Sequence, residues 1–134
     1  MAGYSGSPLP KKLGIGEGTR FAVKSYPPDF TVTLGPLPAG ATWLTRVRAP
    51  LDVAIGFFTV RRELRRAWPG LTKAVAPDGT VWVAWPKRSS GVATDITEDA
   101  LRDELLPTGW VDNKVCAIDD TWSGLRFALR RELR

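Results

Sequence analysis

The chain has 134 residues, of which 43% are hydrophobic and 25% charged, a composition typical of a single domain with one core. It contains no histidine and one cysteine, which excludes an intramolecular disulfide, a thiolate metal cluster and every Ser-His or Cys-His catalytic arrangement. The net charge of +5 is modest for a protein that binds nucleic acid, so we do not expect a nucleic-acid partner.

No segment approaches the roughly 20 consecutive apolar residues of a membrane span. The start of the chain, MAGYSGSPLPKKLGIG, lacks the apolar core of a signal peptide. We therefore expect a cytoplasmic protein without a membrane partner.

The first half of the chain predicts an arm followed by three strands. Residues 1–18 are expected to form an N-terminal arm with one short helix, and residues 19–134 an α/β domain. The predicted strands are 19–25, 42–47 and 52–58, the last an apolar run typical of a strand buried on both faces. Only four residues join the second strand to the third, so the second strand is either short and parallel or antiparallel.

A helical pattern follows the third strand. Its apolar side has helical spacing, and Pro69 is expected to divide it into two helices because the residue before a proline avoids the α region. The opposite side is a predicted solvated face, with arginines at 61, 62, 65 and 66. The sequence Pro77-Asp78-Gly79 predicts a turn before a strand over 80–85.

The last third of the chain predicts a helix over 97–106 and strands over 110–118 and 124–131. Asp95 is expected to cap the helix, with Glu98 completing a capping box. The two strands are too close in sequence for a crossover, so they should pair antiparallel. Cys116 lies in the first of them, where a small buried hydrophobic role is expected.

Alternating strands and helices indicate a three-layer Rossmann-like α/β domain with about six strands, mostly parallel and ending in an antiparallel hairpin. The second half resembles the Rossmann-like fold of S-adenosylmethionine-dependent methyltransferases, with Asp52 before an apolar strand, the Pro77-Asp78-Gly79 turn and Thr108-Gly109-Trp110 before the penultimate strand. The whole chain is also similar to the short bacterial proteins of the domain-of-unknown-function 3052 family, on the stretches GYSGSPLPKKLGI, VWVAWPKRSSGVATDITED and VDNKVCAIDDTWSGLRF. This resemblance implies a fold but no established activity.

The cofactor motif of such folds is missing from its usual place. The glycines Gly14, Gly16 and Gly18 precede the first strand, whereas a Rossmann site needs them after it. Two prolines, Pro27 and Pro28, follow that strand and remove two N–H donors. The second strand ends in arginines instead of an acidic residue, so the sequence predicts a methyltransferase-like fold with no bound cofactor and no metal.

In the resembled methyltransferase topology the last strand inserts antiparallel beside strand 80–85. The resemblance therefore implies that the loop after 80–85 and the turn before the last strand share the carboxyl edge of the sheet, where open α/β sheets bind ligands. The candidate rim comprises Trp85, Lys87, Arg88, Ser89, Ser90, Gly91, Asp119, Asp120 and Trp122. It could be an anion-binding cleft, with cations, hydroxyl donors, a glycine for close approach and a tryptophan wall. It could equally be structural, with the tryptophans packed on each other and the aspartates closing the hairpin.

No catalytic residue emerges from these patterns. The leading hypothesis is a non-enzymatic domain that binds an unknown protein partner or a small anionic ligand at the rim. The alternatives are an enzyme acting on a nucleotide or anionic metabolite, and a methyltransferase with a non-standard cofactor site.

Overall fold

The computed structural model describes residues 7–134, so the first six residues of the predicted arm lie outside the described residues. The six strands are β1 (Arg20–Lys24), β2 (Thr42–Leu44), β3 (Leu51–Phe57), β4 (Val75–Pro86), β5 (Trp110–Ala117) and β6 (Trp122–Leu129). The α-helices are α1 (Leu9–Lys12), α2 (Phe30–Leu34), α3 (Arg61–Ala74) and α4 (Glu98–Leu105). Short 3₁₀ turns follow β4 (Arg88–Ser90), α4 (Leu106–Thr108) and β6 (Arg131–Leu133). Within residues 7–134, no helix has the length and apolar character needed to cross a membrane.

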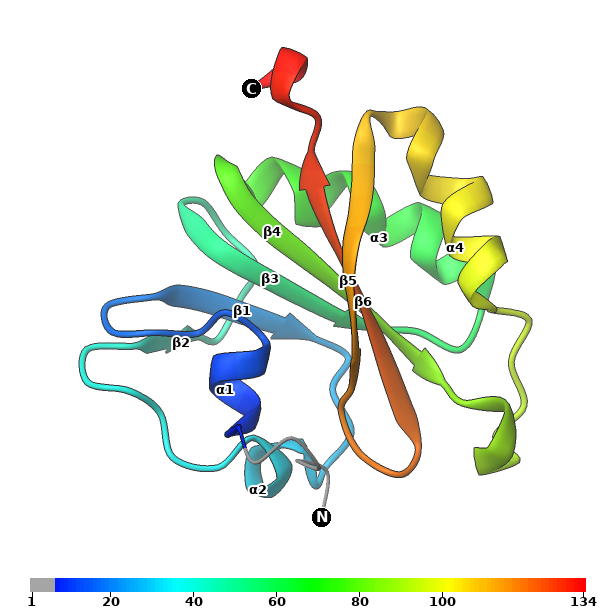
Figure 1. Ribbon diagram of the computed structural model, residues 1–134, viewed down its shortest axis with the longest axis horizontal. Coiled ribbons are helices and arrows are strands. Elements are labelled where there is room, and N and C mark those ends of the chain that lie inside the picture. The colour runs from blue at the N-terminus through cyan, green and yellow to red at the C-terminus, as the bar shows by residue number, and fades with distance from the viewer. Residues whose placement is uncertain (1–6) are drawn as a thin grey trace.

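The strands form one sheet in the order β2-β1-β3-β4-β6-β5 (Figure 1). The first four pair in parallel, and β6 pairs antiparallel with both β4 and β5. This confirms the predicted mostly parallel sheet with a terminal antiparallel hairpin. It also decides the orientation of the second strand, because β2 is parallel to β1 and only three residues long. The predicted range of 42–47 is therefore too long, and the freed residues provide the chain that returns to β3.

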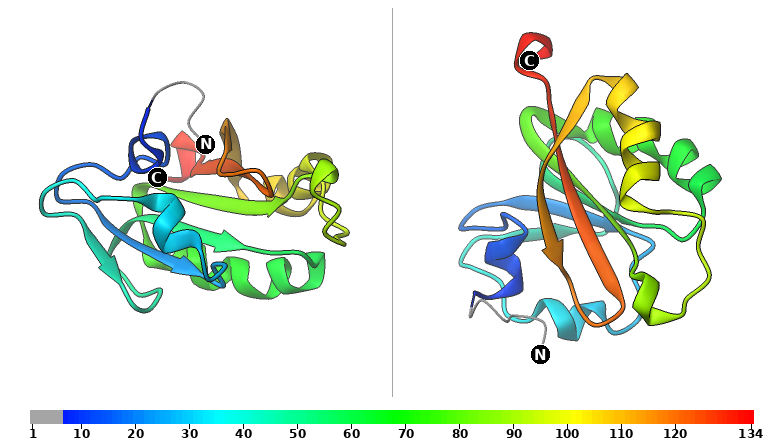
Figure 2. Two further views of the ribbon diagram at one scale, coloured as in Figure 1. Left: turned by 90° about the horizontal axis from the view of Figure 1, so that it is seen from below. Right: turned by 45° about the vertical axis from the view of Figure 1, so that its right-hand side comes forward.

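Helices cover both faces of the sheet (Figure 2). One buried cluster joins α3 and α4 to the residues of β4 that point their way, Val81, Val83 and Trp85. The other joins α1 and α2 to the alternate residues, Trp82 and Ala84. Because successive side chains of a strand point to opposite faces, a nearly continuous apolar strand supplies both layers at once.

The short helix α1 is packed onto the sheet. Leu9, Leu13 and Ile15 are all buried in the cluster that covers the α2 face. The indole N–H of Trp82 donates to the carbonyl oxygen of Leu13 at 2.9 Å, which gives the most buried tryptophan its polar partner. Residues 9–15 therefore belong to the core.

The helix α3 is continuous through Pro69, so the predicted division into two helices is wrong. Its buried side persists across the proline, with Trp68 in edge-to-face contact with Trp110 and Phe127. Pro69 itself is exposed. A proline inside a helix removes one backbone hydrogen bond, and its ring crowds the carbonyl group four residues earlier. Packing of the apolar side outweighs that local preference.

The Pro77-Asp78-Gly79 turn lies inside β4 and not before it. β3 and β4 pair Leu51 with Val75 and then Val53 with Thr80, so four residues of β4 stand opposite one residue, Asp52. The predicted start of this strand at residue 80 is therefore late by five residues. At the other end of the sheet β6 stops at Leu129, before the two arginines that the sequence pattern had included.

Gly79 is needed at this bulge for space. A β-carbon there would lie 2.7 Å from the Asp52 carbonyl oxygen and also collide with Val75. We expect Gly79→Ala to lower the free energy of unfolding by about 1–3 kcal/mol, measured by urea denaturation. The control is Gly70→Ala in α3, where a β-carbon meets nothing within 4 Å and alanine should stabilise by about 0.5–1 kcal/mol. Equal effects of the two substitutions would contradict this assignment.

Candidate functional site

The loop after β4 and the turn before β6 lie side by side at the carboxyl edge of the parallel strands. Pro86 pairs with Trp122, and the Lys87 N–H donates to the Thr121 carbonyl oxygen at 2.7 Å. The two segments of the candidate rim, far apart in the sequence, are thus joined by the insertion of β6 beside β4.

The sheet nevertheless separates the two tryptophans of the rim. Trp85 pairs with Ser123 and is buried in the cluster under α3 and α4. Trp122, one position away in register, packs from the other face with its ring edge-to-face on Phe57 at 5.0 Å between centroids. The tryptophans therefore form neither a pair nor a common wall, because neighbouring positions on a strand face opposite ways.

The hydroxyl-rich part of the loop is a self-contained turn. Ser90 Oγ donates to the Lys87 carbonyl oxygen at 2.6 Å and accepts from the Val92 N–H at 3.2 Å. Ser89 is exposed. Gly91 has a φ of 75°, and a β-carbon there would meet nothing within 4 Å. Glycine thus favours the left-handed conformation at this position, and no other part of the protein approaches it closely.

The two aspartates of the candidate rim have different environments. Asp119 Oδ1 accepts the N–H groups of Thr121 and Trp122, both at 2.8 Å, and so closes the hairpin. Asp120 is exposed to solvent. Within residues 7–134, no three histidine, cysteine or acidic side chains are grouped so that they could hold a metal ion.

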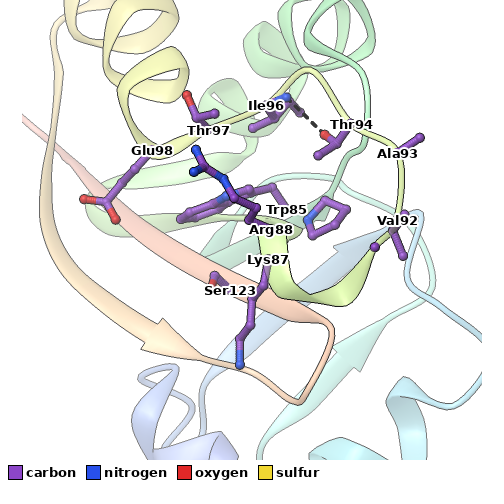
Figure 3. A pocket seen from close by; sticks show the side chains of 12 residues that line it. Trp85, Lys87, Arg88, Val92, Ala93, Thr94, Ile96, Thr97, Glu98 and Ser123 are labelled. Atoms are coloured by element: carbon purple, nitrogen blue, oxygen red, sulfur yellow. Dashed lines mark hydrogen bonds between the residues drawn. The ribbon is translucent and has the colours of Figure 1, made fainter.

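A cavity of about 700 Å³ opens beside the loop, on the face that carries α3 and α4 (Figure 3). It is bounded by the end of β4, the segment 91–97, the first turn of α4 and one residue of β6. Four candidate rim residues line it, namely Trp85, Lys87, Arg88 and Gly91, whereas the other five do not. The remaining lining comes from Pro86, Val92, Ala93, Thr94, Ile96, Thr97, Glu98 and Ser123, none of which the sequence pattern had assigned to a site.

Hydrogen bonds hold the far wall of this cavity against the start of α3. Thr94 Oγ1 donates to the Thr59 carbonyl oxygen at 2.6 Å, and the Asp95 N–H donates to the same oxygen at 3.3 Å. Asp95 Oδ1 in turn accepts the N–H of Arg61, the first residue of α3, at 2.8 Å. Asp95 therefore caps α3 and not α4, which corrects the prediction from its spacing.

Thr97 caps α4 instead. Its hydroxyl oxygen accepts the Ala100 N–H at 3.0 Å, the usual bond of an N-cap to the third helical residue. A capping residue thus stands two positions after the expected one. Because the threonine also lines the cavity, the start of α4 is fixed beside it.

The charges around the cavity are unevenly compensated. Glu98 pairs with Arg102 at 2.6 Å, and Arg102 also binds Asp112 at 3.1 Å. The hydrogen bonds from Glu98 and Asp112 raise the pKa of Arg102 above its usual value. Within residues 7–134, neither Lys87 nor Arg88 takes part in an ion pair. The free charge at this cavity is therefore positive.

The two cations are oriented differently. In Figure 3 the guanidinium of Arg88 is directed toward Thr97. Lys87 extends the opposite way, past Ser123. The apolar side chains of Trp85 and Ile96 line the same cavity as Arg88.

Comparison with known proteins identifies the fold. Neither a protein-family model nor a curated protein sequence matches the chain. A methyltransferase from Aquifex aeolicus dependent on S-adenosylmethionine superposes with a TM-score of 0.61 at 13% identity, covering 87% of this chain and 85% of that one. Fibrillarin from Aeropyrum pernix, with natively bound S-adenosylmethionine, gives 0.57 at 12% identity, covering 95% and 71%. The DhpI complex with S-adenosylhomocysteine gives 0.61 at 12% identity, covering 92% and 83%.

The chain therefore has the Rossmann-like fold of S-adenosylmethionine-dependent methyltransferases, as the sequence predicts. The likeness at these identities is one of fold. Membership of the 3052 family stays a prediction.

The residues at the exit of β1 do not fit S-adenosylmethionine in the manner of a Rossmann-type site. Such a site needs backbone N–H groups after the first strand, followed by a helix that points at the ligand. Here Pro27 and Pro28 occupy that turn, and α2 has only five residues. The rings of Phe30 and Phe57 are both buried, with 5.0 Å between their centroids, and belong to the cluster on the α1 and α2 face of the sheet.

The end of β2 lacks a ribose partner as well. Thr45 and Arg46 follow this strand, and Arg48 stands two residues further on. An acidic side chain at this point would accept the ribose hydroxyls, and none is present. The structure offers this cofactor neither of the two contacts on which a Rossmann-type site depends.

The cap on α3 can be tested directly. We expect Asp95→Ala to lower the free energy of unfolding by about 1 kcal/mol, because the Arg61 N–H loses its acceptor. Asp120→Ala, at an exposed aspartate of the hairpin, should change it by less than about 0.5 kcal/mol. Chemical denaturation of both variants measures the difference. An unchanged Asp95 variant would show that the contact does not cap the helix.

Cys116 gives a prediction for pH. Burial raises the pKa of its thiol, against weaker lowering by Lys12, Lys114 and Lys87. The unfolded chain therefore loses this proton at a lower pH than the folded chain. The thiol's contribution to stability is full below the unfolded pKa and is lost as pH rises from there through the folded pKa. The native thiol should resist alkylation at pH 8 and react only on unfolding, with Cys116→Ser removing the modification. Rapid labelling of the native protein would contradict this.

Proposed function

We propose that this protein is a non-enzymatic, methyltransferase-like domain that binds a small organic anion in the cavity between β4 and α4. The observation that carries the proposal is the guanidinium of Arg88, which takes part in no ion pair within residues 7–134 and lines a cavity of about 700 Å³ together with Trp85. That volume lies within the range of roughly 300–1,000 Å³ typical of small-molecule sites. It favours a small ligand over a protein partner as the occupant.

The chemistry of the lining supports an anion with an apolar part. Arg88 offers a planar fork of donors that suits a carboxylate or a phosphate. Trp85, Val92 and Ile96 provide apolar surface beside it. An aromatic carboxylate or an aromatic phosphate ester would satisfy both at once.

The same lining favours binding over catalysis. The chain has no histidine, and Glu98, the one carboxylate in the cavity wall, is held by Arg102. The hydroxyl oxygen of Thr97 accepts the Ala100 N–H as the N-cap of α4. No pair of groups with opposite acid and base roles faces the cavity, which supports a non-catalytic role.

The proposal predicts that phenyl phosphate and phenylacetate raise the midpoint of thermal unfolding. A ligand at 100 times its dissociation constant adds about 2.7 kcal/mol of stability. Arg88→Ala should abolish the shift, Lys87→Ala should reduce it less, and Arg131→Ala, at an exposed arginine after β6, should leave it unchanged. The measurement is thermal unfolding followed by circular dichroism.

Inorganic phosphate and S-adenosylmethionine complete the panel. Phosphate lacks the ring and should bind more weakly than phenyl phosphate. A shift with S-adenosylmethionine that survives Arg88→Ala would contradict the proposal and favour a methyltransferase with a non-standard cofactor site. Equal shifts in the wild type and the Arg88 variant would show that the anion binds elsewhere.

A further inference from the structure

A second hollow region lies on the other side of α3. A cavity of about 290 Å³ is lined by Lys24, Ser25, Phe58, Glu63, Arg66 and Ala67. An adjoining cavity of about 310 Å³ shares three of these residues, Lys24, Arg66 and Ala67. The two are therefore compartments of one groove between the end of β1 and the exposed side of α3.

A third hollow lies at the loop after β2. It measures about 260 Å³ and is lined by Leu44, Thr45, Arg46 and Arg48. Val47, between the two arginines in sequence, lines one compartment of the groove, so this loop borders the groove. Lys24 and Arg66 therefore line both compartments of the groove, Arg46 and Arg48 belong to the loop beside it, and Glu63 is the one acidic side chain that lines these three hollows.

None of these four cations is neutralised by the protein itself. Within residues 7–134, Lys24, Arg46, Arg48 and Arg66 take part in no ion pair, and all four are exposed. Other arginines of α3 are paired, since Arg61 and Arg65 both contact Glu104. Arg62 also takes part in no ion pair within residues 7–134, but of the unpaired arginines of α3 only Arg66 lines the groove.

The fold explains why these charges converge. Ala22 of β1 packs toward α3, so Lys24, two residues later, falls on the same face at the end of the strand. Arg66 lies on α3 beside Ala67, whose side chain packs on the same buried cluster. β1 has β2 on one side and β3 on the other, so the groove sits at the point where the strand order reverses. Open α/β sheets form their ligand crevices at this point.

We propose that this groove binds a chain of linked phosphoryl groups. Such a chain carries negative charge on every unit, which matches two cations that line the groove and two more in the loop that borders it, and the guanidinium fork of arginine suits phosphate oxygens. An extended acidic peptide turns alternate side chains to opposite sides, so half of its carboxylates would face away. The proposal concerns a different site from the Arg88 cavity and does not depend on it.

The test is isothermal titration of the full chain with tripolyphosphate. The wild type should bind it, and should bind pyrophosphate and inorganic phosphate progressively less tightly. Lys24→Ala/Arg66→Ala should weaken tripolyphosphate binding by at least about tenfold, which corresponds to 1.4 kcal/mol. Affinity should also fall as ionic strength rises, because the cations are exposed.

The controls separate this groove from other positive surface. Arg130→Ala/Arg131→Ala removes the same number of exposed charges near the C-terminus and should bind tripolyphosphate as the wild type does. Arg88→Ala should also bind it normally, while failing to respond to phenyl phosphate. The two proposals can therefore fail independently. Circular dichroism of each variant confirms that it is folded.

Two results would overturn the inference. Equal losses in the Lys24/Arg66 and Arg130/Arg131 variants would show that tripolyphosphate responds only to net charge. Binding of a single-stranded oligonucleotide that depends on Lys24 and Arg66, without binding of tripolyphosphate, would assign the groove to a nucleic-acid backbone instead of a small phosphate chain.

Discussion

The pairing of β6 between β4 and β5 organises the carboxyl edge of this molecule. Because β6 runs against β4 in a register that places Trp122 beside Pro86, the turn before β6 meets the loop after β4. The Lys87 N–H then bonds to Thr121, which ties the two segments together through the backbone. Because neighbouring positions on a strand face opposite sides of the sheet, Trp85 packs in one layer and Trp122 in the other. The cavity on the α3 and α4 side thus receives one tryptophan, and the second supports the opposite layer.

The opposite layer, which carries α1 and α2, adjoins the exit of β1. Its helices are short, with four residues in α1 and five in α2, so aromatic rings supply much of its bulk. Tyr26, Phe30 and Trp43 contact one another, and Phe30 continues to Phe57. A methyltransferase turn with free N–H groups would leave this layer without that packing. Pro27 and Pro28 after β1 thus lead into a cluster of aromatic rings that packs this layer.

The strands could be predicted from the sequence because each rests on local pattern. The sequence leaves the orientation of β2 open, and the place of β6 beside β4 follows from the resemblance to methyltransferases. Apolar runs marked β3 and β4, and the short connection between β5 and β6 required a hairpin. The predictions that were wrong concerned features that depend on contacts between distant segments. Asp95 has the spacing of a cap for α4, yet its carboxylate binds Arg61, 34 residues earlier. Pro69 has a helix-breaking preference, yet tertiary packing of Trp68 keeps α3 whole.

The candidate site shows the same division. Trp85, Lys87, Arg88 and Gly91 could be found because they follow a strand at the ligand-binding edge. The sequence pattern did not identify three other lining residues, Thr94, Thr97 and Glu98. Their positions at the cavity are fixed by a hydrogen bond to Thr59, just before α3, and by contacts within α4. Ser90 and Asp119 carry donors and acceptors that a sequence pattern cannot distinguish from ligand contacts. In the fold both are used by their own turns.

The four arginines at the start of α3 show how the fold decides which charges remain free. Arg61 and Arg65, one turn apart, both bind Glu104 of α4, at 2.9 and 2.5 Å, and the carboxylate is only 11% exposed. These two arginines therefore hold α4 against α3. Arg62 and Arg66 lie on the next stripe of the helix, and Arg66 turns toward β1. Four residues that look equivalent in sequence thus separate into an inter-helix contact and a free basic side. Of the two unpaired arginines, Arg66 faces the end of β1, at the edge where open α/β sheets form their ligand crevices.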